Sequence, residues 1–449
     1  MPIKASNIFK SFLILLSMNL LLTACSHNKK VKWIDDATIY EVNLRQYTEE
    51  GTFEAFQEHL PRLQELGVKI LWFMPIHPIS ETKRKGTLGS YYAVTDYKAV
   101  NPEFGTMEDF KDLVKACHDM GFKVILDWVA NHTGWDNKWI SEHPEWYTQS
   151  NGRIIKPPGT DWSDVADLNY KNKEMRKAMK DAMVFWVKEL DIDGYRCDVA
   201  GSVPVDFWED VSTALHKIKP VFMLAEDGAD YSLMDNAFDA NYNWHLLGSI
   251  NKTAKEGSTV SRIRSDIRRG VSAYPKGSFP MNFITNHDEN SWNGTTKERL
   301  GDAKDLMNAL IFTAPGMPLI YSGQEASLNK RLQFFEKDNI DWSDLTEQEF
   351  YKQLVTLKKD NEALWNGSAG GNITFIETTE KPVLAYARVK GKNKVIFIGN
   401  FTSKENTFSL KKMDVSGSYT NYFNEEEIVL EEGKTLQLGP WDFYIFVNK

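Results

Sequence analysis

The sequence predicts an α/β protein in which a (β/α)8 TIM barrel is followed by a C-terminal antiparallel β-sandwich. From residue 37 to about 360, short apolar runs alternate with amphipathic helical patterns, as in the βα units of a parallel sheet. Eight strand-like runs can be counted in this region, which is the number that closes a barrel. After residue 360 the helical patterns stop, and short alternating runs typical of antiparallel strands follow.

One βα unit near the start of the barrel shows the pattern clearly. Apolar residues recur at three- and four-residue spacing from Phe53 to Leu66, which indicates a helix with one apolar face, although Pro61 disfavours its continuity. Gly67 ends this helix, and a buried strand follows. The eight expected strands are 38–43, 68–74, 122–126, 194–198, 221–225, 237–239, 281–285 and 317–321.

Residues 132–172 interrupt this alternation, since they are rich in Trp, Pro, Gly and Asn and show little periodicity. A loop of this length inside a compact domain usually has a function. We therefore expect a small subdomain inserted after the third strand, within a catalytic barrel at 37–360. The sandwich then occupies 361–449, with strands expected at 373–377, 383–389, 394–400, 407–410 and 443–447.

The N-terminus has the pattern of an export signal. Lys4 and Lys10 precede an apolar run that is too short for a membrane span. The ending Leu-Thr-Ala-Cys at 22–25 resembles the lipobox of bacterial lipoproteins, in which the cysteine is acylated and becomes the mature N-terminus. We expect a signal peptide at 1–25, a tether at 26–36, and export across the inner membrane with anchoring through Cys25 at the outer membrane or cell surface. A soluble secreted protein whose signal contains a cysteine is the alternative.

Composition excludes several classes of protein. Lys and Arg total 53 against 62 Asp and Glu, and this net charge of −9 disfavours nucleic acid as a partner. The three cysteines are too few and too scattered for a disulfide framework or a zinc site. Cys117 falls on the apolar face of an expected helix and Cys197 inside an expected strand, so both are predicted to be core residues.

Acidic residues at strand ends are the candidates for chemistry, because catalytic groups of such barrels lie where the strands end. Four acidic residues stand at such positions. Side chains alternate along a strand, so Arg196 is expected on the same side as Asp198, where it can hold that carboxylate ionised. The four candidates are Asp127, Asp198, Glu226 and Asp288.

The segments around these acids also carry a family resemblance. Residues 127–132 (DWVANH), 194–198 (GYRCD), 224–226 (LAE) and 283–288 (FITNHD) resemble, in this order, the conserved regions of the α-amylase family of glycoside hydrolases. Residues 316–325 resemble the eighth-strand segment of that family, and the likeness extends over about 37–449. The resemblance implies a barrel enzyme that cleaves α-glucosidic bonds with retention of configuration.

The resemblance assigns roles to three acids. Asp198 matches the nucleophile, Glu226 the general acid/base, and Asp288 the acid that grips the sugar hydroxyls. A retaining glycosidase needs one carboxylate to attack the anomeric carbon and one protonated carboxyl group to release the leaving sugar. Two neighbouring aspartates are expected to keep Glu226 protonated, because like charges disfavour another ionisation. Asp227 is the competing candidate for the acid.

The expected substrate-binding residues also come from the resemblance. His132 and His287 match histidines that hydrogen-bond the sugar at the reactive subsite, and Tyr92 matches a tyrosine that stacks under it. Arg196 and Asp127 complete the expected binding set. Four tryptophans of the inserted region could extend the sugar platform, although packing is the more common role of such residues; they are Trp135, Trp139, Trp146 and Trp162.

Two departures from the family pattern bear on calcium and on bond specificity. Asn131 and Asp167 match two oxygen ligands of a family calcium site, but Ser202 stands where a histidine ligand is found. Because calcium takes about six to eight oxygens, calcium is a candidate cofactor only. Val199, directly after the nucleophile, resembles members that cut α-1,6 bonds.

The sequence leaves several functions open. The leading prediction is hydrolysis of mainly α-1,4 bonds in starch, maltodextrins or related α-glucans. A neopullulanase, an α-1,6-glucosidase or a transglycosylase of the same family is the enzymatic alternative. A glucan-binding lipoprotein without catalysis is the alternative of another class, and it is disfavoured because Asp198, Glu226 and Asp288 are all present.

Overall fold

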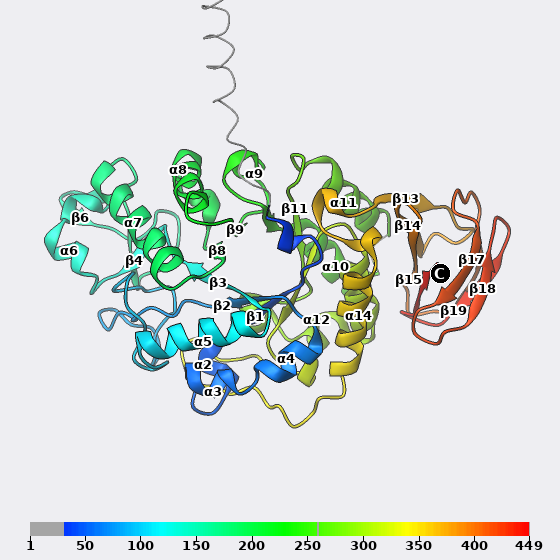
Figure 1. Ribbon diagram of the computed structural model, residues 1–449, viewed down its shortest axis with the longest axis horizontal. Coiled ribbons are helices and arrows are strands. Elements are labelled where there is room, and N and C mark those ends of the chain that lie inside the picture. Colours follow the sequence, from blue (N-terminus) through cyan, green and yellow to red (C-terminus); the bar gives the residue numbers. More distant parts are fainter. Residues whose placement is uncertain (1–30, 258–259, 449) are drawn as a thin grey trace, which may run out of the picture.

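The computed structural model describes residues 31–257 and 260–448, and its main domain is a closed barrel of eight parallel strands (Figure 1). The strands follow the order β1-β12-β11-β10-β9-β8-β3-β2 around the barrel. This confirms the predicted fold class. The barrel strands are β1 (Ile39–Val42), β2 (Ile70–Phe73), β3 (Lys123–Trp128), β8 (Gly194–Cys197), β9 (Phe222–Ala225), β10 (Ala240–Tyr242), β11 (Phe279–Asn282) and β12 (Met317–Tyr321).

Helices cover the outside of the barrel. The segment expected as one helix from 53 to 66 is two helices, because Pro61 stands in the first turn of the second, where a missing N–H breaks no helical hydrogen bond. Thr106 and Asp109 form a reciprocal capping box at the start of α5. The helices are α2 (Leu44–Tyr47), α3 (Phe53–Gln57), α4 (Leu60–Leu66), α5 (Met107–Asp119), α7 (Lys173–Glu189), α8 (Val205–His216), α9 (Leu233–Asn236), α10 (Trp244–Glu256), α11 (Val260–Ser272), α12 (Thr296–Leu300), α13 (Lys304–Thr313) and α14 (Gln348–Asp360).

Alternate residues of the strands fill the interior of the barrel, as their period of two requires. One cluster of buried side chains contains Ile70 and Trp72 of β2 together with the corresponding residues of the neighbouring strands. Val31 and Ile34 belong to the same cluster and are 1% and 2% exposed. The expected tether therefore does not extend to residue 36, because this segment packs against the barrel.

The sixth and seventh barrel strands differ from their expected positions. The sixth was expected at 237–239, but β10 begins at Ala240, because Ala237 follows directly on the short helix α9. The seventh was expected at 281–285, but β11 pairs from Phe279 onward and ends at Asn282. Apolar residues next to the strands, such as Phe238 before β10 and Phe283 after β11, hid these boundaries in the sequence.

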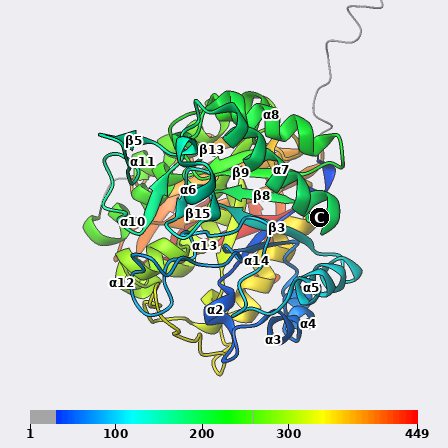
Figure 2. The same ribbon diagram turned by 90° about the vertical axis from the view of Figure 1, so that its left-hand side faces the viewer.

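The inserted segment after β3 forms a small subdomain, which lies at the opposite end of the barrel from the C-terminal domain and faces the viewer in Figure 2. Two short antiparallel pairs and one helix form it. His132 pairs with Asp167 across the first of these strand pairs. Its elements are β4 (His132–Gly134), α6 (Lys138–Glu142), β5 (Gln149–Ser150), β6 (Arg153–Ile154) and β7 (Val165–Asp167).

The C-terminal domain is built from two antiparallel sheets that share one apolar cluster, as a β-sandwich requires. Three of its strands, β17, β18 and β19, were missed in the sequence. Tyr386 and Arg388 attach the domain to α13: the Tyr386 hydroxyl lies 2.6 Å from Thr313 Oγ1, and Arg388 Nη1 donates to the Thr313 carbonyl at 3.0 Å. The strands are β13 (Asn372–Ile376), β14 (Val383–Lys390), β15 (Asn393–Asn400), β16 (Asn406–Ser409), β17 (Gly417–Asn421), β18 (Glu427–Leu430), β19 (Thr435–Leu438) and β20 (Phe443–Val447).

Asp193 anchors the start of β8, the strand that carries two of the candidate site residues. Its Oδ2 accepts hydrogen bonds from His118 Nε2 at 2.7 Å and from the Val124 backbone N–H at 3.0 Å. Lys123 and Lys219 each place Nζ 3.2 Å from Oδ1. Burial alone would raise the pKa of Asp193, but the His118 hydrogen bond and the Lys219 charge outweigh it and lower the pKa to about 2.

Asp193→Asn is expected to lower the free energy of unfolding at neutral pH by about 2 kcal/mol, since a pKa unit corresponds to about 1.4 kcal/mol. A depressed folded-state pKa stabilises the protein above the unfolded value of about 4, and this stabilisation is lost as the pH falls towards about 2. Urea unfolding of both proteins near neutral pH and near pH 3 measures the effect. If the difference between the unfolding free energies of the two proteins grows as the pH is lowered, the depressed pKa of Asp193 is wrong.

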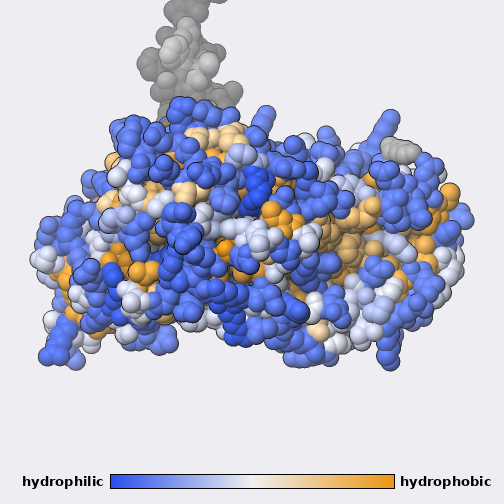
Figure 3. Space-filling model, turned by 90° about the horizontal axis from the view of Figure 1, so that it is seen from below, coloured by the Kyte–Doolittle hydropathy of each residue, from blue (hydrophilic) through white to orange (hydrophobic). Residues whose placement is uncertain are grey.

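Within 31–257 and 260–448, no helix combines the length and apolarity needed to cross a bilayer. The face drawn in Figure 3 is mainly hydrophilic, with apolar side chains in separate patches. The expected signal peptide and lipidated Cys25 lie outside the described residues.

Candidate active site

A cavity of about 520 Å³ opens where the barrel strands end. Five of the eight sequence-predicted catalytic and substrate-binding residues line it, and residues of the insert and of the loop before α14 complete its wall. The cavity is lined by Lys85, Ser90, Tyr92, His132, Asp161, Trp162, Asp164, Val165, Asp198, Val199, Glu226, Asp288, Trp292, Phe334 and Phe335.

Asp198 and Glu226 come from neighbouring strands. Cys197 pairs with Ala225 across β8 and β9, so the two acids directly follow paired residues. The Glu226 backbone N–H donates to the Cys197 carbonyl at 2.9 Å, which continues the pairing by one residue. The two acids therefore stand side by side at the ends of adjacent strands.

The guanidinium of Arg196 joins the acids. Its Nη1 donates to Asp127 Oδ1 at 2.9 Å and to Asp198 Oδ1 at 3.1 Å. Its Nη2 forms an ion pair with Glu226 Oε2 at 2.9 Å, and Nε donates to the Tyr242 hydroxyl at 3.0 Å. Because one buried cation faces three carboxylates, it fixes their relative positions.

The protonation of Asp198 differs from expectation in the unliganded protein. Burial raises the pKa of Asp198 well above its usual range, Glu226 raises it further, and Arg196 only partly opposes the rise. From the sequence, Arg196 was expected to hold Asp198 ionised. Instead, Arg196 is shared among three acids and does not outweigh the effect of burial on Asp198.

Val199 gives Glu226 a second donor through a strained backbone. This β-branched residue has φ = +36°, in the left-handed region that it rarely adopts. Its N–H donates to Glu226 Oε2 at 2.8 Å. Strain of this kind costs about 1–3 kcal/mol and is found mostly at functional sites. A single sequence gives no sign of it.

Asp288 faces the first two acids from a different part of the barrel. It stands six residues beyond the end of β11, just before a π-helix at Glu289–Asn293. Burial disfavours its ionised form, but His287 and Arg196 outweigh this effect and lower the pKa of Asp288. Its side chain is 38% exposed, so solvent weakens the shift. It therefore presents an ionised carboxylate to the cavity.

His132 and Tyr92 line the cavity on the side of the insert. Burial lowers the pKa of His132 to about 3, so this ring is neutral at ordinary pH. Tyr92 stacks on the Phe334 ring, with ring centres 6.2 Å apart. The hydroxyl of Tyr92 donates to Asp127 Oδ2 at 3.1 Å, which holds the tyrosine ring in place.

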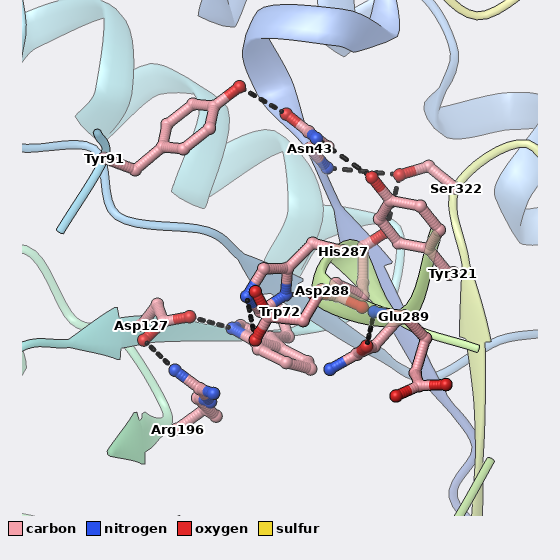
Figure 4. Close-up of polar contacts among 12 residues, drawn as sticks. Asn43, Trp72, Tyr91, Asp127, Arg196, His287, Asp288, Glu289, Tyr321 and Ser322 are labelled. Atoms are coloured by element: carbon pink, nitrogen blue, oxygen red, sulfur yellow. Dashed lines mark hydrogen bonds and ion pairs between the residues drawn. The ribbon is translucent and has the colours of Figure 1, made fainter. Parts of the chain in front are cut away.

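Asp127, Arg196 and His287 were expected to contact substrate but lie behind the cavity wall, with exposed fractions of 0%, 0% and 1%. Asp127 also accepts a hydrogen bond from Trp72 Nε1 at 3.2 Å, and Figure 4 shows it between Trp72 and Arg196. In the unliganded protein these three residues hold their neighbours, because packed side chains separate them from the open space.

A second group of polar contacts fixes the loop that carries Tyr92 (Figure 4). Asn43, just beyond β1, accepts a hydrogen bond from the Tyr91 hydroxyl at 3.0 Å and donates to the Tyr321 hydroxyl at 2.9 Å. The first and last barrel strands are thereby joined to the residue next to Tyr92.

Aromatic side chains form part of the rim. Trp292 is 52% exposed and packs against Phe334 and Phe335, with ring centres 5.3 and 5.7 Å away. Of the four tryptophans of the insert, only Trp162 lines this cavity. The others pack elsewhere, as Trp139 does against Tyr97. Trp292 was not among the residues predicted from the sequence, although it follows Asp288 by four positions.

The loop after β2 closes one side of the cavity by touching both of its walls. Lys85 forms an ion pair with Asp164 of the insert at 3.0 Å. Leu88 N–H donates to the Phe335 carbonyl at 3.0 Å on the opposite side. The segment from Lys85 to Leu88, which we call the strap, thus connects the two walls and bounds the cavity at this edge.

Of the candidate calcium ligands, Asp167 lies in the insert and Asn131 directly before it, and both are outside the cavity lining. Leu168 N–H donates to the Asn131 carbonyl at 3.2 Å, which places Asn131 beside the segment that carries Asp167. Burial raises the pKa of Asp167. Among the residues that the structure describes, no group of three or more His, Cys, Asp and Glu could hold a metal ion. The donor set thus fits calcium only in part.

Comparison with known proteins agrees with this geometry. A family profile described as "Alpha amylase, catalytic domain" matches residues 36–162 and 159–369. α-Amylase MalA of Haloarcula japonica is 27% identical over 400 residues; the match covers 84% of this chain and 57% of that protein's length.

Two solved structures share the fold along nearly their whole length. The noncanonic maltogenic α-amylase AmyB of Thermotoga neapolitana has a TM-score of 0.84 and 28% identity, covering 92% of this chain and 98% of its own. An α-amylase of Lactobacillus plantarum has a TM-score of 0.81 and 31% identity, covering 92% and 99%. The chain therefore belongs to the α-amylase family of glycoside hydrolases, and residues 36–369 form its catalytic domain.

Proposed function

We propose that this chain hydrolyses mainly α-1,4-glucosidic bonds of starch, maltodextrins or related α-glucans with retention of configuration. The observation that carries the proposal is the bridge that Arg196 forms between Asp198 and Glu226 beneath the cavity. A retaining glycosidase needs its two carboxyl groups on either side of one glycosidic bond. Asp288 supplies a third acid on the wall of the same cavity.

The proposed reaction has two steps. Asp198 attacks the anomeric carbon while Glu226 protonates the departing glycosidic oxygen, which leaves the sugar esterified to Asp198. Glu226, now ionised, takes a proton from water, which attacks the same carbon and releases Asp198. Positive charge on the sugar ring favours an ionised Asp198, as the proposed nucleophilic attack requires.

Incubation with maltooligosaccharides is expected to release sugars that are initially in the α-configuration, because two displacements at one carbon restore its stereochemistry. Proton NMR during the first minutes of reaction identifies this anomer before mutarotation. The β-anomer appearing first would refute the double displacement. The Asp198→Asn variant, which lacks the proposed nucleophile, serves as the inactive control.

Product analysis on starch and pullulan distinguishes the rival functions. Maltotriose from pullulan indicates α-1,6 cleavage, whereas panose indicates α-1,4 cleavage. Products longer than the substrate indicate transglycosylation, and binding without any product indicates a glucan-binding protein. The strap at Lys85 favours short chains or chain ends over attack within long chains.

Calcium binding through Asn131 and Asp167 is a separate proposal. Support comes from their positions in segments that are joined by a backbone hydrogen bond and from the burial of Asp167. Calcium would stabilise the insert against the barrel and takes no part in the proposed reaction. Calorimetry of the protein with added calcium or chelator tests the proposal, and an unchanged unfolding temperature would count against it.

Lipid anchoring of Cys25 at the outer membrane or cell surface also stays a proposal, supported by the apolar run and the Leu-Thr-Ala-Cys ending. Metabolic labelling with a palmitate analogue, compared between the full chain and Cys25→Ser, tests it. Labelling that survives this substitution would exclude Cys25 as the modified residue.

A further inference from the structure

A buried acid that the reaction above does not use lies next to the candidate site. Glu41 is the third residue of β1 and is 0% exposed. Its Oε1 lies 2.5 Å from Nδ1 of His287, and its Oε2 has no hydrogen-bond partner in the structure. A buried carboxylate costs free energy unless it is paired, so its contact with His287 calls for a role.

The other ring nitrogen of His287 points towards the active site. Its Nε2 lies 2.8 Å from the Tyr92 hydroxyl and 3.3 Å from Asp288 Oδ2. Tyr92 donates its only hydroxyl hydrogen to Asp127, so its oxygen can only accept from Nε2. The ionised Asp288 also only accepts. Nε2 must therefore carry a hydrogen.

The hydrogen on Nε2 depends on what faces Nδ1. A neutral imidazole has one hydrogen, and an ordinary acceptor at Nδ1 would draw it away from Nε2. The contact between Glu41 and Nδ1 holds an additional proton, so Nε2 keeps its own hydrogen. We propose that Glu41 is a positioning residue that locks His287 Nε2 as a hydrogen-bond donor towards Asp288 and Tyr92.

Other buried histidines show what happens without such an acid. His77 and His132 are 0% and 3% exposed, and burial lowers their pKa values to about 4 and about 3. His287 is buried as deeply, yet Asp288 and Glu41 raise its pKa well above the usual range despite burial. The neighbouring carboxylates therefore decide the protonation of His287.

Asp127 and Arg196 complete the charged groups around this network. Burial raises the pKa of Glu41 despite the opposing effects of His287 and Arg196, so Glu41 and Nδ1 of His287 share the proton between them. Asp127 adds a carboxylate that favours the charged ring, and Arg196 favours the ionised form of Asp288. From Glu41, contacts run through His287, Tyr92 and Asp127 to Arg196, which holds Asp198 and Glu226. Glu41 thus acts on the reaction through other residues and does not touch substrate.

The expected effect of Glu41 on kcat rests on the proposed hydrolysis. The expected hydrogens on the His287 ring do not depend on it. Nitrogen-15 NMR of histidine-labelled protein reports the hydrogens on each ring nitrogen without any substrate. For wild type we expect His287, assigned with a His287→Gln variant, to carry hydrogen on both nitrogens near pH 7.5. A His287 ring without hydrogen on Nε2 would overturn the proposal, whatever the enzyme's activity.

Glu41→Gln keeps the size of the side chain and removes the acid. Without it, the pKa of His287 should fall, because Asp288 alone then opposes the effect of burial, so Nε2 loses its hydrogen at a lower pH than in the wild type. We expect the alkaline limb of the kcat profile to move about one pH unit or more towards acid, with kcat falling more than KM rises. An unchanged pH profile together with a retained Nε2 hydrogen would refute the role of Glu41.

Glu325→Gln is the matched control. Glu325 is also 0% exposed, but it accepts hydrogen bonds from Tyr40 at 2.6 Å and from Arg62 at 2.8 Å rather than contacting His287. Its substitution should lower stability and leave the shape of the pH profile unchanged. If Glu325→Gln shifts the alkaline limb as Glu41→Gln does, the shift reflects general destabilisation and the proposal fails. The wild-type spectrum tests the proposal even if Glu41→Gln does not fold.

Discussion

Asp198→Asn is expected to reduce kcat on maltooligosaccharides by about 10⁴-fold or more, the scale found when a catalytic nucleophile is removed. The amide has the shape of the carboxylate and still offers an oxygen to Arg196 Nη1, so the fold and glucan binding should persist. Initial rates measure the loss, and calorimetric titration with a maltooligosaccharide measures binding. Near-normal turnover would show that the nucleophile is wrongly assigned.

A direct chemical test of the same assignment uses the covalent intermediate. A fluorinated maltosyl fluoride should esterify the wild-type protein at Asp198, and peptide mass spectrometry locates the label. Asp227→Asn is the control substitution and also tests the competing acid. Asp227 Oδ1 accepts from the Ala229 and Asp230 N–H groups at 2.7 Å, bonds that an asparagine oxygen retains. The Asp227→Asn substitution should leave kcat within about tenfold of the wild-type value.

Arg196→Met is expected to lower the free energy of unfolding by about 3–5 kcal/mol, the cost of leaving a buried charge without its partner. Asp127 and Asp198 are 0% and 8% exposed and would lose their shared cation. kcat/KM should fall by about 10²-fold or more, because the acids lose their fixed geometry. Urea unfolding and initial rates on maltooligosaccharides measure both effects.

Arg388→Met is the matched control for this prediction. Arg388 is 2% exposed, but the hydrogen bonds of its guanidinium go to backbone carbonyls, such as that of Thr313, and not to the acids. Its loss should destabilise the protein while kcat stays near wild type. Arg196→Lys should be intermediate, since one ammonium group keeps the charge but cannot contact three carboxylates as the guanidinium does. Equal kinetic losses in the two methionine variants would contradict the role of Arg196.

The barrel could be predicted because its signals are local. A strand buried on both faces is an apolar run, and each run precedes an amphipathic helix. The placement of Arg196 and Asp198 on one side of the chain follows from the period of a strand. Family motifs added the order of the acids along the chain.

Weak local patterns account for the elements that were missed. β18 has Leu430 as its only buried residue, so its sequence hardly differs from that of a loop. Residues 31–36 were included in the expected tether because they show no clear element pattern, yet Val31 and Ile34 find an apolar surface at the barrel that only the folded chain creates. Burial of this kind depends on partners that are remote in sequence.

The sequence by itself determined the fold class, the candidate acids and the family. Only the tertiary structure decided how protons and charges are distributed among them. Glu41 and His287 are 246 positions apart and meet because the barrel closes. A pKa depends on burial and on charges within a few ångströms, and neither quantity exists until distant segments of the chain pack together.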